Sequence, residues 1–362
     1  MIIFSYIFLA FAVLGALDRL FGNKFGLGEE FERGFKFFTA TSLSMIGIII
    51  LAPALAVWLG PVFEGFYSIF KIDPSIIPAS LFANDMGGAP LALEIAKNET
   101  IGKFNGYVVS TMLGCMISFT IPFASGVVEK EYHNDMFLGF VCGIATIPVG
   151  CIVGGLIYGI PFTAVIVDLI PVLIISILFS LGLIFFRQAT CAVLKCFAAI
   201  LKVIICIGLI IGIISVLLKK ELPAPLDSFD SAADICVRIS VTLSGAFPFV
   251  FVLGKLLKKP LAFFGKKLGI KEISALSLIA TLVTNATAFA AIKDMDRRGI
   301  VVNSAFACSA AYIFGSHLAY TSAECPELVG TVLLSKFISG VASVVLALII
   351  TRNLKDSFKK TP

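Results

Sequence analysis

The 362-residue sequence has few of the side chains on which soluble enzymes and nucleic-acid-binding proteins depend. Only 14% of its residues are charged, and it contains two histidines and one tryptophan. No HExxH, GxSxG or Walker-type phosphate-binding loop occurs, so the common signatures of metalloproteases, serine hydrolases and ATPases are absent. The net charge of +5 comes from basic loops rather than from a basic stripe. We therefore expect neither an enzyme nor a nucleic-acid partner.

The nine cysteines lack the spacing of a metal site. They are scattered along the chain, and no CxxC pair occurs. Cysteine behaves as a small apolar side chain in packed helices, so packing explains all nine. The sequence predicts no metal and no other cofactor, and it identifies no coupling ion.

Long apolar runs dominate the sequence instead. Hydrophobic residues make up 59% of the chain, and about 20 apolar residues suffice for a helix to cross a bilayer. We predict an all-α polytopic membrane protein, with residues 1–362 forming a single integral membrane transport domain. The first run lacks the basic start of a secretory signal, so it is interpreted as a span. The expected spans are 2–17, 37–58, 104–127, 136–158, 163–186, 195–218, 232–254, 300–322 and 327–350, with polar connections at 18–36, 219–235 and 255–272.

Two further segments, 75–96 and 273–292, are ambiguous. If both cross the membrane, the chain has eleven spans, and the lysine-rich segment 255–272 lies outside. That arrangement conflicts with the excess of Lys and Arg in cytoplasmic loops. If both segments re-enter, about nine transmembrane helices plus two re-entrant or broken hairpins result, and most basic residues lie inside. The distribution of Lys and Arg between the two faces favours this second arrangement.

Helix-breaking residues support re-entry. Pro78, Gly87, Gly88 and Pro90 surround Asn84 and Asp85 in the first segment. The second carries Thr284, Asn285 and Thr287 at a corresponding depth. Non-helical backbone is tolerated inside a membrane only where it is buried in protein or lines a wet cavity. Two such segments indicate one shared polar site, as in transporters with discontinuous helices.

The order of the elements suggests an internal repeat. Each half reads span, hairpin, span, span, which predicts repeat one at 36–160, linking helices at 161–218 and repeat two at 232–352. A constant shift of 198 residues matches Gly47 with Gly245, and also the pairs Ser42 and Ser240, Asn105 and Asn303, and Ser118 and Ser316. The hairpins enter from opposite faces in this arrangement. We therefore predict an inverted-repeat transporter fold.

Asp85 is the strongest functional candidate. A charge at the bilayer centre costs roughly 2.5–3.5 kcal/mol on insertion scales, so a cation, water or a cationic ligand must compensate it. Lys336 could do so, which would make a structural ion pair. Asp168 could be a second acidic group, and His317 could be a packing residue instead of a ligand. The predicted substrate-binding residues are Asn84, Asp85, Gly87, Gly88, Ser118, Thr284, Asn285, Thr287, Ser316 and His317.

Four ordered motifs resemble the ethanolamine permease (EutH) family of bacterial ethanolamine utilisation. They are SLFANDMGGAPLALEIA (80–96), GIATIPVGCIVGGLI (143–157), IKDMDRRGIVVNSAFACSAAYIFGSHLAYTSA (292–323) and LAPALAVWLGP (51–61). The resemblance covers most of the chain. It implies a multi-pass protein of the bacterial inner membrane that admits ethanolamine, which a cytoplasmic ammonia-lyase then degrades. Asp85 stands at the Asp of the family's DMGG, and His317 at its HL.

Ethanolamine suits the residues found independently. Asp85 could receive the ammonium group, and Asn84, Asn285 or the threonines could bind the hydroxyl. We expect alternating access with a small amine as ligand and the lipid bilayer as surroundings. A channel-like facilitator stays open because no sodium or proton site is evident, and so does a homo-oligomer. One alternative is a sodium-coupled carrier of another small polar solute, such as a carboxylate or nucleoside. Another is a membrane sensor that does not transport.

Overall fold

The computed structural model describes residues 2–352, with side chains from Ser5 onward except at positions 258, 261, 262, 264 and 266. The regular elements of the described part are all helices, which confirms the predicted all-α class. The longer helices are α1 (Ile2–Leu20), α2 (Leu27–Phe70), α7 (His133–Ile157), α9 (Ile170–Phe185), α10 (Arg187–Leu218), α11 (Phe229–Leu268), α12 (Glu272–Val283), α14 (Arg297–Ala310) and α16 (Val329–Ile350). The shorter ones are α3 (Ile76–Leu81), α4 (Gly88–Ile95), α5 (Glu99–Phe104), α6 (Ile121–Val127), α8 (Phe162–Asp168), α13 (Asn285–Ala290) and α15 (Ser316–Glu324).

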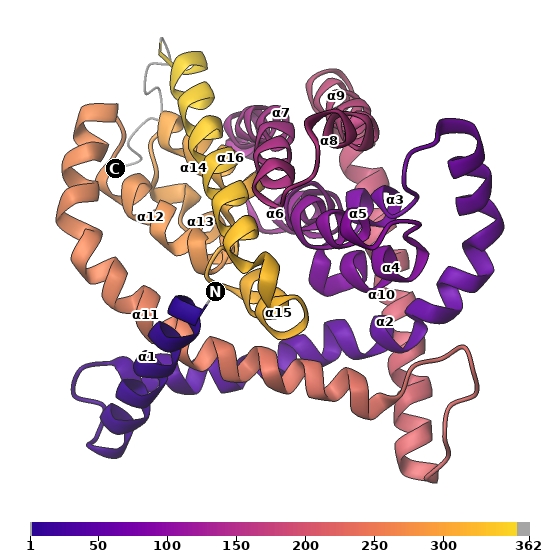
Figure 1. The fold of residues 1–362 in the computed structure, drawn as a ribbon. Helices are drawn as coiled ribbons and strands as arrows, with labels where there is room; N and C mark the ends of the chain where they lie inside the picture. The colour runs from indigo at the N-terminus through magenta and orange to yellow at the C-terminus, as the bar shows by residue number, and fades with distance from the viewer. Residues whose placement is uncertain (1, 353–362) are drawn as a thin grey trace.

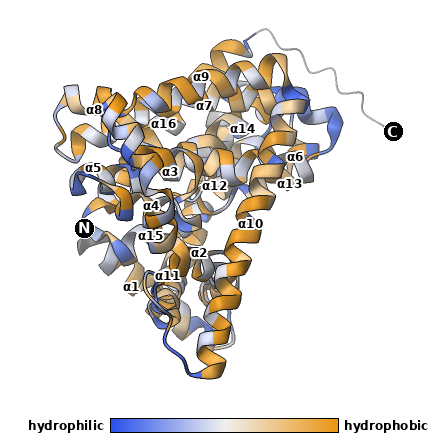
Figure 2. Cartoon of the chain, turned by 90° about the vertical axis from the view of Figure 1, so that its right-hand side faces the viewer, coloured by the Kyte–Doolittle hydropathy of each residue, from blue (hydrophilic) through white to orange (hydrophobic). Residues whose placement is uncertain are grey.

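Within the described residues, six helices are long and apolar enough to cross a membrane. They are Leu27–Phe70, Glu99–Val127, Lys130–Ile157, Arg187–Leu218, Phe229–Leu257 and Pro326–Ile350; α8 and α9, bent by 44°, make a seventh if they are one span. The outer helices α9 and α10 are apolar along most of their length (Figure 2). On α10, Ile200, Val203 and Ile210 are more than half exposed, as expected of side chains that face lipid.

Two of the expected polar connections are largely helical. α2 begins at Leu27, so it takes up much of the segment 18–36, and α11 continues through the lysine-rich stretch to Leu268. A helix can extend beyond the apolar run, because charged side chains at its end remain in water. The expected connection 219–235 agrees with the structure over its first part. The chain is non-helical between Leu218, where α10 ends, and Phe229, where α11 begins.

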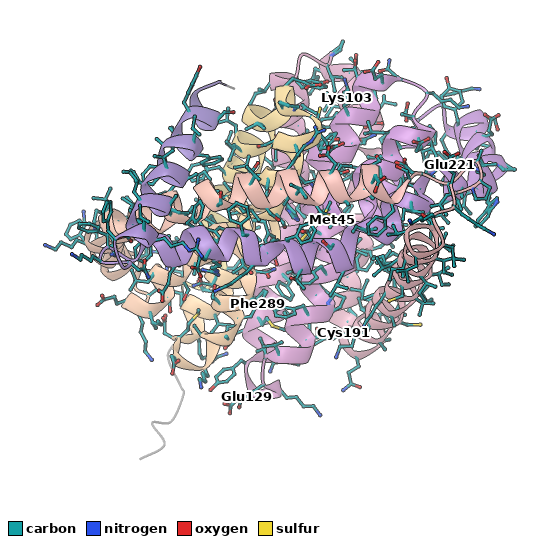
Figure 3. All side chains as sticks on the ribbon, turned by 90° about the horizontal axis from the view of Figure 1, so that it is seen from below. Met45, Lys103, Glu129, Cys191, Glu221 and Phe289 are labelled. Atoms are coloured by element: carbon teal, nitrogen blue, oxygen red, sulfur yellow. The ribbon has the colours of Figure 1, made fainter. Side chains whose placement is uncertain are left out.

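α2 and α11 form the base of the molecule. They run side by side across it, as the view from below shows with Met45 of α2 between them (Figure 3). The two helices are antiparallel: Arg33 lies over the Phe247 ring, and Asp227 N, just before α11, donates to Ile50 O. α1 packs against α11, and α10 packs against α2. The broken segments therefore lie above a two-helix base (Figure 1).

The upper layer contains the irregular helices. Two π-helical stretches, η2 (Asn105–Gly114) and η3 (Met116–Thr120), follow α5, and they are buried almost throughout. α7 packs against both α14 and α16. Ser339 Oγ of α16 lies 2.7 Å from Ser309 Oγ of α14 and donates to Thr146 O of α7 at 3.0 Å. Hydrogen bonds between small residues hold membrane helices together, because hydrocarbon offers no competing partner.

Candidate functional site

The first broken segment is a helix interrupted at its middle. α3 ends at Leu81, the backbone of the following Phe82 is extended, and a single 3₁₀ turn, η1 (Asn84–Met86), leads to Gly87. Gly87 has φ of 104°, and a Cβ there would lie 2.6 Å from Ile48 Cγ1 of α2. Both the positive φ and the close approach require glycine. The interruption therefore follows from local sequence, and it presents Asp85 at the tip.

The two ends of this segment meet at Asp73. Its Oδ2 accepts hydrogen bonds from the backbone N–H groups of Lys97 and Asn98, at 3.0 and 2.9 Å. Its Oδ1 accepts from Ser75 N at 3.0 Å and from Ser75 Oγ at 2.6 Å. The residues before α3 and after α4 are thus joined by one carboxylate. The segment returns to the place where it started, as a re-entrant hairpin does.

The second broken segment is also closed by one carboxylate, but this carboxylate follows the segment in the chain instead of preceding it. α12 stops at Thr284, which is extended, and α13 starts at Asn285. Asp296, which follows the segment, accepts from Lys271 N at 2.8 Å and from Ser274 Oγ at 2.7 Å. Asp296 also accepts from Gly299 N and so begins α14. We call these two arrangements the Asp73 clasp and the Asp296 clasp.

A cavity of about 300 Å³ lies between the two broken segments. Among the described residues that line it, Asp85 is the one acidic residue, and aromatic rings form part of its wall. The helix α2 closes one side, and the helices that follow each broken segment close the others. The lining residues are Phe37, Ala40, Thr41, Ser44, Ala83, Asp85, Met86, Cys115, Phe119, Thr284, Tyr312, Ser316 and His317.

Lys336 does not pair directly with Asp85. His317 lies between them, with Nε2 3.9 Å from Asp85 Oδ1 and Nδ1 3.3 Å from Lys336 Nζ. Lys336 is 1% exposed and donates to Thr111 O at 2.6 Å. The ammonium is therefore held behind the cavity wall by a carbonyl and an imidazole. The Asp85 carboxylate, whose side chain is 15% exposed, faces the cavity.

Four of the predicted site residues line this cavity: Asp85, Thr284, Ser316 and His317. Gly87 and Gly88 shape the first tip; a Cβ on Gly88 would lie 2.3 Å from Phe82 O. Thr287 lines a neighbouring cavity of about 380 Å³, which Thr284 also borders.

The other three predicted residues hold the tips from behind. Asn84 Nδ2 donates to His317 O at 3.4 Å, and Ser118 Oγ accepts from Ala83 N at 3.1 Å. Asn285 accepts from Tyr312 Oη at 2.6 Å and donates to Thr120 Oγ1 at 3.2 Å. These amides and the hydroxyl are turned away from the 300 Å³ cavity, so they are not among its lining residues.

The sequence reasoning missed the contribution of α2. Thr41 and Ser44 line the cavity at helical spacing, and Phe37 lies one turn before Thr41. Their signal was the short polar run TATSLS (39–44) inside an otherwise apolar span. Tyr312 and Phe119 were missed too, because nothing in a single sequence distinguishes a lining aromatic residue from a packing one.

Apolar helices long enough to cross a bilayer, two broken segments closed at their bases and a cavity between them define a multi-pass membrane protein with an internal site. The family described as "Ethanolamine utilisation protein, EutH" matches residues 1–350. The chain belongs to this family, which confirms the resemblance seen in its motifs.

Curated relatives cover nearly the whole chain. It is 36% identical over 357 residues to the "Probable ethanolamine permease EutH" of Listeria monocytogenes serotype 1/2a, covering 99% of this chain and 96% of that protein. It is 35% identical over 397 residues to the protein of the same name from Escherichia coli K12, covering 99% and 97%. It is 34% identical over 342 residues to "Uncharacterized protein YxeR" of Bacillus subtilis 168, covering 94% and 92%. No solved structure matches the chain.

Proposed function

We propose that this protein is a permease that carries ethanolamine across the bacterial inner membrane, with the cavity between the two broken segments as its binding site. The observation that carries the proposal is the Asp85 carboxylate at the tip of the first segment, which faces the cavity and is the one acidic group among its described lining residues. The names of the family and of two relatives support the substrate.

The cavity chemistry suits a small ammonium alcohol. Asp85 receives the ammonium group, and Phe37, Phe119 and Tyr312 supply ring faces that attract a desolvated cation. The hydroxyl groups of Thr41, Ser44 and Thr284 are available to the substrate hydroxyl, although those of Thr41 and Ser44 also bond carbonyls of their own helix. Each substrate end thus has a partner of matching chemistry. When water leaves the cavity, the substrate replaces the hydrogen bonds that the polar groups of the cavity lose.

We propose that two structural repeats surround this site and that they allow alternating access to it. Helix ends recur at intervals of 198 residues: Leu20 with Leu218, Phe70 with Leu268, and Glu99 with Arg297. This register makes α1 the counterpart of α10 and α2 the counterpart of α11. We propose repeats that begin with α1 and with α10. The linking segment is then α8 and α9, shorter than the 161–218 expected from sequence.

The repeats are proposed to be inverted because α2 and α11 are antiparallel. Both helices are long and apolar enough to span, and a rotation that superposes antiparallel spans reverses their direction through the membrane. The packing of the first helix of each proposed repeat agrees with an inverted arrangement. α1 packs on α11 of the other repeat, and α10 packs on α2 of the other repeat. With broken segments as re-entrant hairpins, one enters from each face, so rocking of one repeat against the other opens the site alternately.

Radiolabelled ethanolamine uptake into proteoliposomes tests the proposal, with wild type compared to Asp85→Asn. A charge-assisted hydrogen bond contributes about 1.5–3 kcal/mol, so we expect substrate binding to weaken roughly tenfold to a hundredfold. The matched control is Glu94→Gln, which removes an exposed acid from the same hairpin and should leave uptake unchanged.

Three results would count against this function. Normal uptake by a folded Asp85→Asn protein would remove the ammonium-binding role. Sodium-dependent uptake of a carboxylate or nucleoside that ethanolamine does not inhibit would favour the alternative carrier. Absence of any solute flux would favour a membrane sensor.

A further inference from the structure

A second buried carboxylate lies outside the cavity and has little to compensate it. Asp168 ends α8 at the 44° bend before α9, and it is 4% exposed. Its Oδ1 accepts one hydrogen bond, from Asn105 Nδ2 at 3.3 Å, and its Oδ2 has no hydrogen-bond partner in the part of the chain that the structure describes. Among the described residues, no Lys, Arg or His side chain lies within 4 Å of Asp168 to form an ion pair.

The surroundings of Asp168 are rich in acceptors and poor in donors. Asn105 Nδ2 also donates to Ser75 Oγ at 3.0 Å, and that hydroxyl donates to Asp73 Oδ1. Asn105 Oδ1 is buried without a partner. The Asp73 carboxyl at the hairpin base acts electrostatically on Asp168, and Asp168 in turn acts on the Cys151 thiol of α7. None of these groups supplies a positive charge, so the cluster as it stands holds a buried acid without a cation.

The second repeat serves as an internal comparison, which rests on the proposed repeat. Asn303, the counterpart of Asn105, donates to Ser274 O at 2.8 Å and to Gly299 O at 2.9 Å. The Asp296 clasp then closes that hairpin base with one carboxylate. α8 and α9 have no counterpart there, so a hairpin base can be closed without an acid in the place of Asp168. Closing the base of the first hairpin therefore does not explain why an acid stands at position 168.

We propose that Asp168 is a proton-binding site, occupied in the conformation described here and emptied when the base of the first hairpin moves. A proton on the carboxyl removes the buried charge and adds a donor to a cluster in which two oxygens, Asp168 Oδ2 and Asn105 Oδ1, lack one. A proton also requires no cavity, unlike a hydrated metal cation.

The position of Asp168 links its proton to the substrate site, and this step rests on the proposed function. Asn105 connects Asp168 to Ser75, the residue before α3, and the far end of α3 leads to Asp85. Movement of the hairpin that opens its base lets water reach Asp168. The carboxyl O–H then breaks and the proton leaves to water on that side. When the repeats rock the other way and water of the opposite face reaches the cluster, the carboxylate takes a proton from that water and the O–H forms again. One proton thus crosses with each cycle.

Infrared difference spectroscopy of the purified protein tests the proton site without any transport. The C=O stretching band of a protonated carboxylic acid should be present at neutral pH in wild type and missing in Asp168→Asn. In Asp168→Glu the band should shift in frequency, which shows that it belongs to position 168 even if one variant is unstable. Identical wild-type and Asp168→Asn spectra would overturn the proposal.

Ethanolamine uptake into proteoliposomes tests the coupling. An external medium one pH unit more acidic should drive roughly tenfold accumulation by wild type for one coupled proton. Asp168→Asn should lose this accumulation and keep ethanolamine exchange at equal pH within about twofold, because a neutral amide imitates the permanently protonated carboxyl. Protein-free liposomes measure leakage of the uncharged amine.

The outcomes separate the two proposals. Acid-driven accumulation retained by Asp168→Asn would overturn the coupling role, and so would accumulation driven by a sodium gradient at constant pH. If wild type shows the infrared band but no ethanolamine uptake, the proton site is supported and the proposed substrate is wrong.

Discussion

At the scale of single residues, two glycines decide how closely the halves pack. A Cβ on Gly47 of α2 would lie 1.8 Å from Ile205 O of α10, and a Cβ on Gly245 of α11 would lie 2.1 Å from Phe8 O of α1. These are the glycines that the 198-residue shift matches. Since backbone cannot yield as a flexible side chain can, neither contact tolerates a methyl group.

We expect Gly47→Ala to destabilise the protein strongly, because α2 and α10 must separate to admit the methyl group. Overpacking costs typically about 1–3 kcal/mol and occasionally more. The matched control is Gly60→Ala in the same helix, where nothing lies within 4 Å of the added Cβ. Thermal unfolding with a thiol-reactive dye measures both, since buried cysteines such as Cys115 and Cys236 react only on unfolding. Equal melting temperatures for the two variants would show that the close approach is unimportant.

At the scale of the element, the clasps explain how helical segments of six to twelve residues stay in place. Helices so short are marginal without tertiary support. Asp73 and Asp296 each join the start and the end of a broken segment through several hydrogen bonds. The chain can therefore interrupt both helices near the cavity while their bases remain tied.

Asp296→Ala should release the base of the second hairpin. It leaves Lys271 N, Ser274 Oγ and Gly299 N without their acceptor, and leaving a buried donor unsatisfied costs about 1–3 kcal/mol. Hydrogen exchange of segment 271–299 should accelerate at least tenfold. Asp294→Ala, which removes the exposed acid of the same KDMD motif, is the control and should exchange like wild type. Equal exchange in both variants would contradict the clasp.

At the scale of the whole molecule, the proposed inverted arrangement specifies which faces the hairpin ends share. Cysteines placed at Lys71 and Thr100 flank the first hairpin, and those at Glu272 and Lys293 flank the second; all four positions are exposed. In a background with the exposed Cys196 and Cys206 changed to Ser, membrane-impermeant reagent should label each pair from one face. The two pairs should differ in that face.

Two labelling patterns would contradict this arrangement. Opposite faces within a pair would make that segment a full span and restore a count nearer eleven. The same face for both pairs would make the repeats parallel.

The sequence by itself determined the class, the family and the interruptions within 75–96 and 273–292. It did not reveal the break between α14 and α15, which lies inside the expected span 300–322. Apolar run length sets whether a helix can enter a membrane, and Gly87 or Thr284 acts on its own backbone, so these properties are local. Asp85 was identifiable for the same reason: a carboxylate is conspicuous in an apolar run wherever the chain folds.

Only the tertiary structure decided which side chains surround the cavity and which groups compensate one another. Asn84 and Asn285 lie beside the tips yet turn to partners on other elements, whereas Thr41 and Ser44 enter from a distant helix. The pairing of Lys336 with His317, and the unpaired Oδ2 of Asp168, depend on how α16, α15 and α8 pack. The face that each helix presents is set by the antiparallel crossing of α2 and α11, and that long-range contact is not encoded in any local pattern.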